Sequence, residues 1–441
     1  MALTKNREGE DIMESISTLS LNRWIAKEEE KTYIEVPFAV EGRIERIEVQ
    51  YTYERSDGTT VIDIGLRSPD RIVGWSGGAR NSFFVGLGKA TPGYLAGLIP
   101  AGEWNVLLGA YRVPEGGCMV QINLKLVHNH PRWMKGDLHM HGVHSDGSYS
   151  IADAIQSGKD KGLEFMAFTD HNNASQNLST LAADDQLVLI PGVELTSYKG
   201  HANLLGQLDA LDDFRILTPE QAASTLQRAA DKGAFVSLNH PFDSDCPWEL
   251  GFDVPYDAIE VWNGPWRPLN ETAVRWWQEQ LVSGRKLVAI GGSDTHKPNP
   301  YVAHGTPTTY VRAEAESKEE ILRAIRQGRV VLSFNTDETF IDLSIEEAGV
   351  GDTMIVDEEK EYEIAVKISG AAGDKVQLWS DRGLEREWIV ANEGVYSFPV
   401  EADRLFYRAE SNRYLAHLGV TITSCLTNPI YIHRLRAEAP V

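Results

Sequence analysis

The sequence has few cysteines, and their placement excludes two common uses of this residue. Cys118, Cys246 and Cys425 are the only three among 441 residues, and they are widely separated. An odd number of distant cysteines fits neither a disulfide framework nor a cysteine-rich zinc site. We therefore expect three reduced thiols.

The sequence also lacks an excess of basic residues and any apolar run long enough to cross a membrane. Lys and Arg number 42 against 64 Asp and Glu, which gives a net charge of −22. Such a surface repels a phosphate backbone, so nucleic acid is not an expected partner. The first thirty residues have no apolar core of the kind found in signal peptides. We expect a cytoplasmic protein that does not associate with a membrane.

The hydrophobic pattern divides the chain into four segments. Residues 1–30 are charged and are predicted to form a helical or extended N-terminal segment. Residues 31–133 and 337–441 contain short alternating runs separated by turn residues, which predicts two small all-β sandwich-like domains. Residues 134–336 instead alternate apolar runs with capped helical patterns, which predicts an α/β domain.

The predicted α/β domain repeats one arrangement, a short apolar run that ends in His, Asp or Glu. The runs occupy residues 135–141, 163–171, 187–194, 234–240 and 287–296. In parallel barrels the active site is built at the C-terminal ends of the strands. The polar residues at the ends of these runs are therefore expected to meet in one pocket.

Nine side chains at or near the run ends have the chemistry of metal ligands. They are six imidazoles and three carboxylates: His139, His141, Asp146, His171, Glu194, His201, His240, Asp294 and His296. His139 and His141 are two residues apart in a strand, so both point to the same face. Asp294 and His296 repeat that spacing. Nine ligands are too many for one tetrahedral ion, which predicts a site of two or three ions. Isolated histidines such as His304 are interpreted as ordinary core or surface residues.

These motifs resemble those of the PHP (polymerase and histidinol phosphatase) superfamily. The matching residues are HMH at 139–141, TDH at 169–171, Glu194, NHP at 239–241 and SDTH at 293–296. The GHANLLG and TNPIYI segments and the flanking β-type regions resemble the CehA/McbA-type branch, which includes carbaryl hydrolases. The resemblance implies a distorted (β/α)7 PHP barrel, flanked here by the two sandwich-like domains, that binds up to three ions of zinc, manganese or iron.

The resemblance also implies how the ligands are shared. The first ion would take His139, His141, Glu194 and Asp294, the second Glu194, His201 and His240, and the third Asp146, His171 and His296. Glu194, Asp294 and His296 would then be the catalytic residues. Asp137 and Asp170 would orient ligand imidazoles by accepting their hydrogen bonds. The alternative for these two carboxylates is an ordinary strand-end or helix-capping role.

One further segment is predicted to contact the substrate. EVWNGPWRPLN at residues 260–270 follows another apolar run and offers Asn263, Trp266 and Arg267 at the same rim. Arg267 is predicted to clamp an anionic group, and the tryptophan to stack on an aromatic leaving group. Cys246 is not expected to be a ligand, because oxygen- and nitrogen-rich sites rarely recruit a single thiolate.

The charge of the predicted site favours an anionic substrate. Three carboxylates contribute −3 and three divalent ions would contribute +6, which leaves about +3, or about +2 with a bridging hydroxide. The sequence therefore predicts hydrolysis of a phosphorylated small molecule, by a phosphatase or phosphodiesterase reaction. Hydrolysis of a carbamate or carboxyl ester by the same hydroxide is the first alternative. A non-catalytic metal-binding module is the second.

Overall fold

The computed structural model describes residues 4–5, 11–12, 16–54, 58–128, 131–182, 187–357 and 360–434. The rest of the expected N-terminal segment, residues 1–3, 6–10 and 13–15, lies outside the described residues. The chain divides into two compact units, residues 1–131 with 314–317 and residues 132–313 with 318–441. In the described part of the chain, no helix has both the length and the apolar character to cross a membrane.

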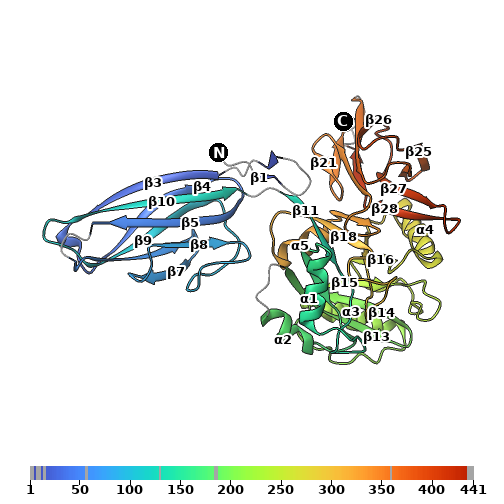
Figure 1. The fold of residues 1–441 in the computed structure, drawn as a ribbon, viewed down its shortest axis with the longest axis horizontal. Coiled ribbons are helices and arrows are strands. Elements are labelled where there is room, and N and C mark those ends of the chain that lie inside the picture. The colour runs from blue at the N-terminus through green and yellow to red at the C-terminus, as the bar shows by residue number, and fades with distance from the viewer. Residues whose placement is uncertain are drawn as a thin grey trace, which may run out of the picture. The chain divides into compact units, whose positions relative to one another are not determined.

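The first unit is a sandwich of two four-stranded antiparallel sheets (Figure 1). One sheet has the order β3 (Ile16–Ile25), β10 (Cys118–His128), β5 (Ile44–Tyr53) and β8 (Ser82–Gly86). The other has the order β4 (Tyr33–Val40), β9 (Gly102–Arg112), β6 (Val61–Arg67) and β7 (Ile72–Gly77). Two short strands, β1 (Thr4–Lys5) and β2 (Asp11–Ile12), pair with each other, and the 3-10 helix η1 spans Lys27–Glu29. Exposed and buried residues alternate along β4, so the inward faces supply a core that includes Trp104 and Ile122.

The N-terminal boundary of this sandwich differs from the prediction. Strand β3 pairs with β10 from Ile16 to Ile25, so the sandwich begins at Ile16 and not at residue 31. Leu19 and Leu21 from β3 pack against its core. Charged residues on both sides of this strand concealed it, although Arg23 is the only charged residue within Ile16–Ile25. Its inward positions before Ile25 are only partly buried, because the strand lies on an edge of the sheet.

The second unit is built on a 15-stranded mixed sheet, and the strands that surround the predicted pocket are β11 to β17. Their bounds are β11 (Arg132–Asp137), β12 (Phe165–Phe168), β13 (Val188–Ser197), β14 (Gly200–Leu205), β15 (Phe235–Asn239), β16 (Ala258–Asn263) and β17 (Val288–Gly292). Strands β11, β12 and β13 are parallel, as are β15, β16 and β17, and β14 is antiparallel to both of its neighbours. The same sheet continues through β18 (Thr308–Ala313) and β19 (Val330–Ser333).

A parallel bridge between Met140 and Thr295 joins the chain beyond β11 to the chain beyond β17. The backbone N–H of His141 donates to the carbonyl of Thr295 at 2.9 Å, and the N–H of Asp294 donates to the carbonyl of His139 at 2.8 Å. The first and last strands of this group therefore meet at their C-terminal ends. Two ligand-bearing segments, more than 150 residues apart in the chain, lie side by side as a result.

Five helices accompany these strands in the described part of the second unit: α1 (Ile151–Asp160), α2 (Ser175–Ala182), α3 (Pro219–Asp231), α4 (Pro268–Val282) and α5 (Lys318–Arg326). The predicted capping box at the start of α3 is confirmed, with Thr218 and Gln221 each accepting from the backbone of the other. The described residues form no helix between β13 and β14 or between β15 and β16. The predicted α/β class is confirmed, with more sheet and fewer helices than a complete (β/α)7 alternation.

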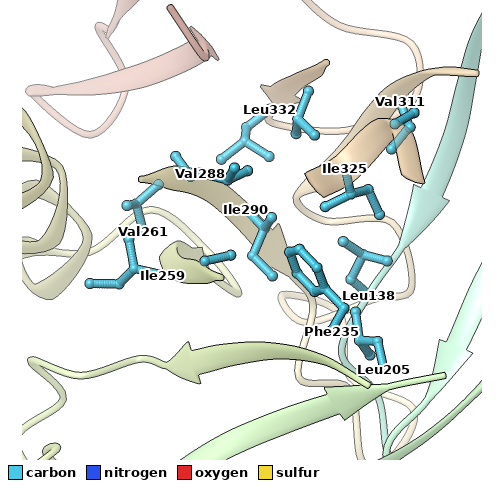
Figure 2. Packing of buried hydrophobic residues seen from close by; sticks show 14 of the residues in the cluster. Leu138, Leu205, Phe235, Ile259, Val261, Val288, Ile290, Val311, Ile325 and Leu332 are labelled. Carbon is cyan, nitrogen blue, oxygen red and sulfur yellow. The ribbon is translucent and has the colours of Figure 1, made fainter. Parts of the chain in front are cut away.

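The interior of this sheet is filled by apolar side chains (Figure 2). Leu138, Leu205, Phe235 and Ile259 have no measurable exposure, and Ile290 is 1% exposed. Figure 2 shows these side chains directed toward one another from several strands. Because apolar side chains fill this core, most of the predicted metal ligands lie at or near the ends of the strands.

The C-terminal region, predicted as a separate domain of residues 337–441, instead shares a sheet with the middle of the chain. Strand β19 pairs with β28 (Val420–Thr427), and the side chain of Asn428 bonds both backbone groups of Ala289 at 2.8 and 2.9 Å. The remaining strands are β20 (Phe340–Ile345), β21 (Ala348–Gly349), β22 (Thr353–Val356), β23 (Tyr362–Ser369), β24 (Lys375–Ser380), β25 (Gly383–Ile389), β26 (Gly394–Val400), β27 (Phe406–Leu415) and β29 (Ile430–Arg434). Its own core forms where the β20–β23–β26 sheet faces β24, β27 and β28. Backbone hydrogen bonds across β19 and β28 thus make it part of the second unit.

Candidate metal centre

The structure brings all nine predicted ligands together in overlapping clusters. Within each cluster the ligand atoms lie within 4.8 Å of one another. The clusters are His139, His141 and Asp294; His139, Glu194 and His240; His141, Asp146, His171 and His296; and His201, His240 and Cys246. Each cluster shares His139, His141 or His240 with another, so the ligands form one continuous group. Most of them lie at or beyond the C-terminal ends of the parallel strands, and His201 lies near the start of the antiparallel strand β14.

Glu194, which is fully buried on β13, lies at the centre of this group. Its Oε1 atom lies 3.2 to 3.6 Å from imidazole nitrogens of His139, His201 and His240. Its Oε2 atom points the other way and lies 2.7 Å from Nδ1 of His171. The two oxygens of one carboxylate therefore face different sets of imidazoles, which is the arrangement of a carboxylate that bridges two ions.

Asp294 is a second carboxylate that lies close to two imidazoles of the group. Its Oδ1 atom lies 3.2 Å from Nε2 of His141 and 3.4 Å from Nε2 of His139. The backbone of Asp294 has a φ of 52°, and that of His240 a φ of 29°, although neither residue is glycine. Such conformations cost about 1 to 3 kcal/mol each and cluster at functional sites. These two backbone conformations therefore lower the stability of the fold while they direct both side chains toward the ligand group.

The distances fit shared metal ions better than hydrogen bonds. Nε2 of His139 and both ring nitrogens of His141 are buried and have no hydrogen-bond partner among the described residues. Two ligands that each lie about 2.1 Å from one tetrahedral ion are separated by about 3.4 Å. The nitrogen-to-oxygen separations of 3.2 to 3.6 Å around His139 and His141 match that value. The residues present thus fit a metal centre.

Asp146 with His171 and His296 forms the open side of the group. Nε2 of each histidine lies 3.4 Å from Oδ1 of Asp146. The side chain of Asp146 is 62% exposed, whereas those of His139 and Glu194 are 1% exposed. Asp146 is therefore the most exposed of the nine predicted ligands.

The electrostatics of the buried ligands favour positive charge among the carboxylates. Burial opposes the charge of Glu194, yet the neighbouring imidazoles, above all His139, hold the pKa of this carboxyl well below its usual range. Burial also opposes the charge of Asp294, but His139 and His141 hold the pKa of this carboxyl well below its usual range. Burial also opposes protonation of His139, but the carboxylates of Asp294, Glu260 and Glu194 raise its pKa well above the usual value. A bound metal ion would supply the positive charge that this arrangement stabilises.

Glu260 is a member of the site that the sequence reasoning missed. This carboxylate on β16 is 2% exposed, and its Oε1 atom lies 2.9 Å from Nδ1 of His139. Its Oε2 atom accepts from the backbone N–H of His240 at 3.0 Å and from the side chain of Asn263 at 3.1 Å. A signal was available, because a charged residue inside an apolar strand requires a buried partner.

The described contacts of Asp137 and Asp170 correspond to the strand-end role that is the alternative in the sequence analysis. Oδ1 of Asp137 accepts from the N–H of Ser293 at 3.0 Å, and its Oδ2 accepts from that of Gly305 at 2.9 Å. Asp170 accepts from the N–H of Gly142 at 2.9 Å and from the Ser145 hydroxyl at 2.7 Å. In the contacts of the described residues, these carboxylates hold loop backbone and not imidazoles. The reason is that strand ends leave buried N–H groups without a sheet partner.

Cys246 contacts His240, one of the predicted ligands. Its Sγ atom lies 3.6 Å from Nδ1 of His240, while Nε2 of the same ring lies 3.6 Å from Oε1 of Glu194. One imidazole nitrogen thus faces the carboxylate and the other faces the thiol. Ligand atoms of Cys246, His240 and His201 also lie within 4.8 Å of one another.

The three predicted substrate-binding residues lie differently with respect to the group. Asn263 is 3% exposed and donates to Oδ2 of Asp294 at 3.3 Å. Arg267 donates to Oδ1 of Asn263 at 2.8 Å, and its guanidinium lies 3.8 Å from Asp243. Trp266 packs edge-on against the buried Trp262, with ring centroids 4.7 Å apart. Asn263 and Arg267 are therefore connected to the ligand group, and Trp266 is engaged in packing.

A cluster of imidazoles and carboxylates at the strand ends of an α/β sheet defines the second unit as a metal-binding α/β protein. Residues 137–233, which are less than half of the chain, match the PHP domain family model. The predicted resemblance to the PHP superfamily is thereby confirmed.

Two curated proteins illustrate the sequence similarity. The chain is 27% identical over 146 residues to an uncharacterized protein of Methanocaldococcus jannaschii. The matched region covers 30% of this chain and 82% of that protein. The chain is also 41% identical over 51 residues to the DNA polymerase/3'-5' exonuclease PolX of Bacillus subtilis. This matched region covers 12% of this chain and only 9% of the polymerase. The second match is therefore a short segment of a much longer protein.

Among solved structures, similarity is found to a two-domain protein of Bacteroides vulgatus that contains a predicted PHP-like metal-dependent phosphoesterase. That protein is 18% identical, with coverage of 67% of this chain and 96% of the other and a TM-score of 0.38. An amidohydrolase of Chromobacterium violaceum with bound sulfate and no metal is 15% identical, with coverage of 43% and 96% and a TM-score of 0.31. Similarity at this level establishes no activity for the chain.

Proposed function

We propose that this protein is a metal-dependent phosphoesterase that hydrolyses a phosphorylated small molecule and holds two or three ions of zinc, manganese or iron. The observation that carries the proposal is the placement of Glu194. Its two oxygens face different imidazole sets within a group of nine ligands. The match of residues 137–233 to the PHP domain supports the same class of metal-dependent hydrolase.

Residues at different positions in the ligand group would have different roles in this reaction. Divalent ions bound there would polarise a phosphoryl oxygen and activate water as the nucleophile. The buried Glu194 and the partly exposed Asp294, both beside His139 and His141, would hold these ions at a fixed separation. His296, beside the exposed Asp146, stands on the side from which a substrate would approach.

The rim supplies a group for an anionic substrate. Arg267 is 43% exposed and connects through Asn263 to Asp294, so a bound anion would lie between the guanidinium and the ligand group. A guanidinium fork matches phosphate oxygens in shape and charge. Nucleic acid is not the proposed substrate, because the net charge of −22 opposes a polyanion.

We further propose that β11 to β17, joined by the bridge between Met140 and Thr295, form a distorted (β/α)7 barrel of the kind that the resemblance implies. Two strand connections without a helix, β13 to β14 and β15 to β16, would be the distortion in the described part of the chain. The antiparallel strand β14 carries His201 into the group from the hairpin, which a regular alternation would not allow.

The test is turnover by protein reconstituted separately with zinc, manganese and iron(II). The substrate panel contains phosphomonoesters, phosphodiesters, aryl carbamates and aryl carboxyl esters, and His139→Ala is assayed in parallel. We expect hydrolysis of a phosphoester that depends on added metal and is lost in His139→Ala. Turnover confined to carbamates or carboxyl esters would replace the proposal with the first alternative from the sequence. A metal-loaded protein without turnover on the whole panel would favour a non-catalytic module.

A further inference from the structure

A cavity lies in the same unit as the metal centre, at the opposite end of β17. It has a volume of about 320 Å³, and its lining includes Lys286, Arg326, Arg329, Asp352, Thr353 and Tyr431. Val288 opens β17 and also lines this cavity, whereas Asp294 follows the other end of the strand. Six residues of extended chain span roughly 20 Å. The cavity is therefore separate from the ligand group.

The lining of this cavity carries an excess of positive charge. It contains three cationic side chains and one carboxylate, and Arg329 pairs with that carboxylate, Asp352, at 3.2 Å. In the described ranges of the chain, no carboxylate lies within 4.0 Å of the ammonium of Lys286 or the guanidinium of Arg326. A local excess of two cations is unexpected in a chain with a net charge of −22. Its position in a cavity points to an anionic ligand.

Both of the uncompensated cations are held in place by neutral partners. The ammonium of Lys286 donates to the hydroxyl of Thr353 at 2.8 Å and lies 4.7 Å from the centre of the Tyr431 ring. The guanidinium of Arg326 donates to the carbonyl of Gly233 at 3.0 Å and lies over the ring of Phe235. Each cation retains further N–H donors, because an ammonium has three and a guanidinium has five. These donors can bind the oxygens of a ligand.

One wall of the cavity is built by two backbone segments in direct contact. Gly351 has a φ of 89°, and a Cβ atom at this position would lie 2.5 Å from the backbone nitrogen of Arg329. Gly328, in the turn after α5, has a φ of 73°. The loop before β22 can therefore approach this turn only because residue 351 has no side chain. A wall fixed in this way lowers the ordering cost of binding a ligand.

We propose that this cavity binds a small oxyanion, such as inorganic phosphate or the phosphate group of a small phosphate monoester. The volume falls within the range of roughly 300 to 1,000 Å³ that is usual for small-molecule sites. An ammonium and a guanidinium in the lining of one cavity suit the several acceptor oxygens of phosphate. The proposal does not rest on the activity of the metal centre, because no residue is shared between the two sites.

The test measures phosphate binding by metal-free protein, so that ions at the ligand group do not contribute. Isothermal titration with inorganic phosphate is compared with titration by chloride at equal ionic strength. We expect saturable binding of one phosphate per chain to the wild type, and no such binding of chloride. The double variant Lys286→Ala/Arg326→Ala should bind phosphate at least about tenfold more weakly, since two charge-assisted contacts are removed.

Two control variants distinguish this cavity from cationic side chains elsewhere on the protein. Arg323→Ala removes a cation from the last turn of the same helix but not from the cavity, so its phosphate affinity should equal that of the wild type. Arg323 and Arg326 both lie near the C-terminal end of the α5 dipole. Equal phosphate binding in Arg323→Ala would therefore show that the effect of Arg326 does not come from the helix dipole alone. Arg267→Ala should also bind normally. No saturable phosphate binding, equal affinity in the double variant, or a loss in Arg267→Ala would each overturn the proposal.

Discussion

Oε1 of Glu260 lies 2.9 Å from Nδ1 of His139. Glu260 is on β16, and His139 follows the end of β11. Because Nδ1 of the ring faces Glu260, Nε2 is left to face Glu194 and Asp294. A metal-binding histidine is commonly oriented in this way by a carboxylate on its other nitrogen. Glu260 is therefore a positioning residue of the centre.

The role of Glu260 predicts the behaviour of Glu260→Gln. The carboxylate accepts hydrogen bonds from His139, His240 and Asn263, and an amide has only one acceptor atom. We expect metal affinity to fall by roughly 10- to 100-fold, as measured by competition with a chromophoric chelator. Glu271→Gln, an exposed change on α4, is the control and should bind metal normally. Equal affinity in both variants would show that Glu260 serves only to satisfy buried donors.

A second prediction concerns the central carboxylate. Glu194→Gln should lose most of its activity and at least one ion per chain, because both oxygens face imidazoles and an amide nitrogen cannot bind a cation. Elemental analysis should find two or three ions in the wild type and fewer in the variant. The exposed Glu249→Gln provides the matched control. Unchanged metal content in Glu194→Gln would contradict the bridging role.

A third prediction distinguishes contact from coordination at Cys246. The thiol faces Nδ1 of His240, and Nε2 faces Glu194, so the sulfur should not bind the ion. Cobalt(II)-loaded protein should show no thiolate-to-metal charge-transfer absorption in the near ultraviolet. Cys246→Ser should keep the metal content of the wild type. A charge-transfer band that disappears in Cys246→Ser and persists in Cys425→Ser would make this thiol a ligand.

A fourth prediction tests the substrate class through Arg267. If the substrate is a phosphoester, inorganic phosphate should inhibit competitively, and Arg267→Ala should weaken this inhibition about tenfold. That value is the lower end for a charge-assisted contact, chosen because the side chain is 43% exposed. Arg275→Ala on the exposed side of α4 should leave inhibition unchanged. Carbamate turnover that is insensitive to phosphate and to Arg267→Ala would favour the carbamate hydrolase.

A fifth prediction concerns stability in acid. Burial lowers the pKa of His304 to about 4, whereas the unfolded side chain has a pKa near 6.5. Between these values the unfolded chain binds a proton that the folded chain does not, so stability is full above about pH 6.5 and falls as the pH falls toward 4. Lowering the pH from 7 to 5 should cost roughly 2 kcal/mol through this residue. His304→Gln should show a correspondingly smaller loss in its free energy of unfolding, and an identical loss would exclude the assignment.

The sequence by itself determined the chemistry of the centre and the class of the fold that carries it. Apolar runs that end in His, Asp or Glu can be recognised without a structure, because a strand buried on both faces tolerates charge only at its ends. His139 and His141, two residues apart, already had to share a face. The nine ligands and the α/β class followed from such local patterns.

Only the tertiary structure decided the contacts between distant segments. Glu260 and His139 are 121 residues apart, and their meeting depends on the register of seven strands. The same holds for Asp137, whose partners Ser293 and Gly305 lie more than 150 residues away. Strand β3 and the pairing of β19 with β28 were likewise outside the reach of composition, because edge pairing depends on which backbone donors remain free after the sheet has formed. Local periodicity states which residues face inward, but the partner that each one meets is set by the packing of the whole chain.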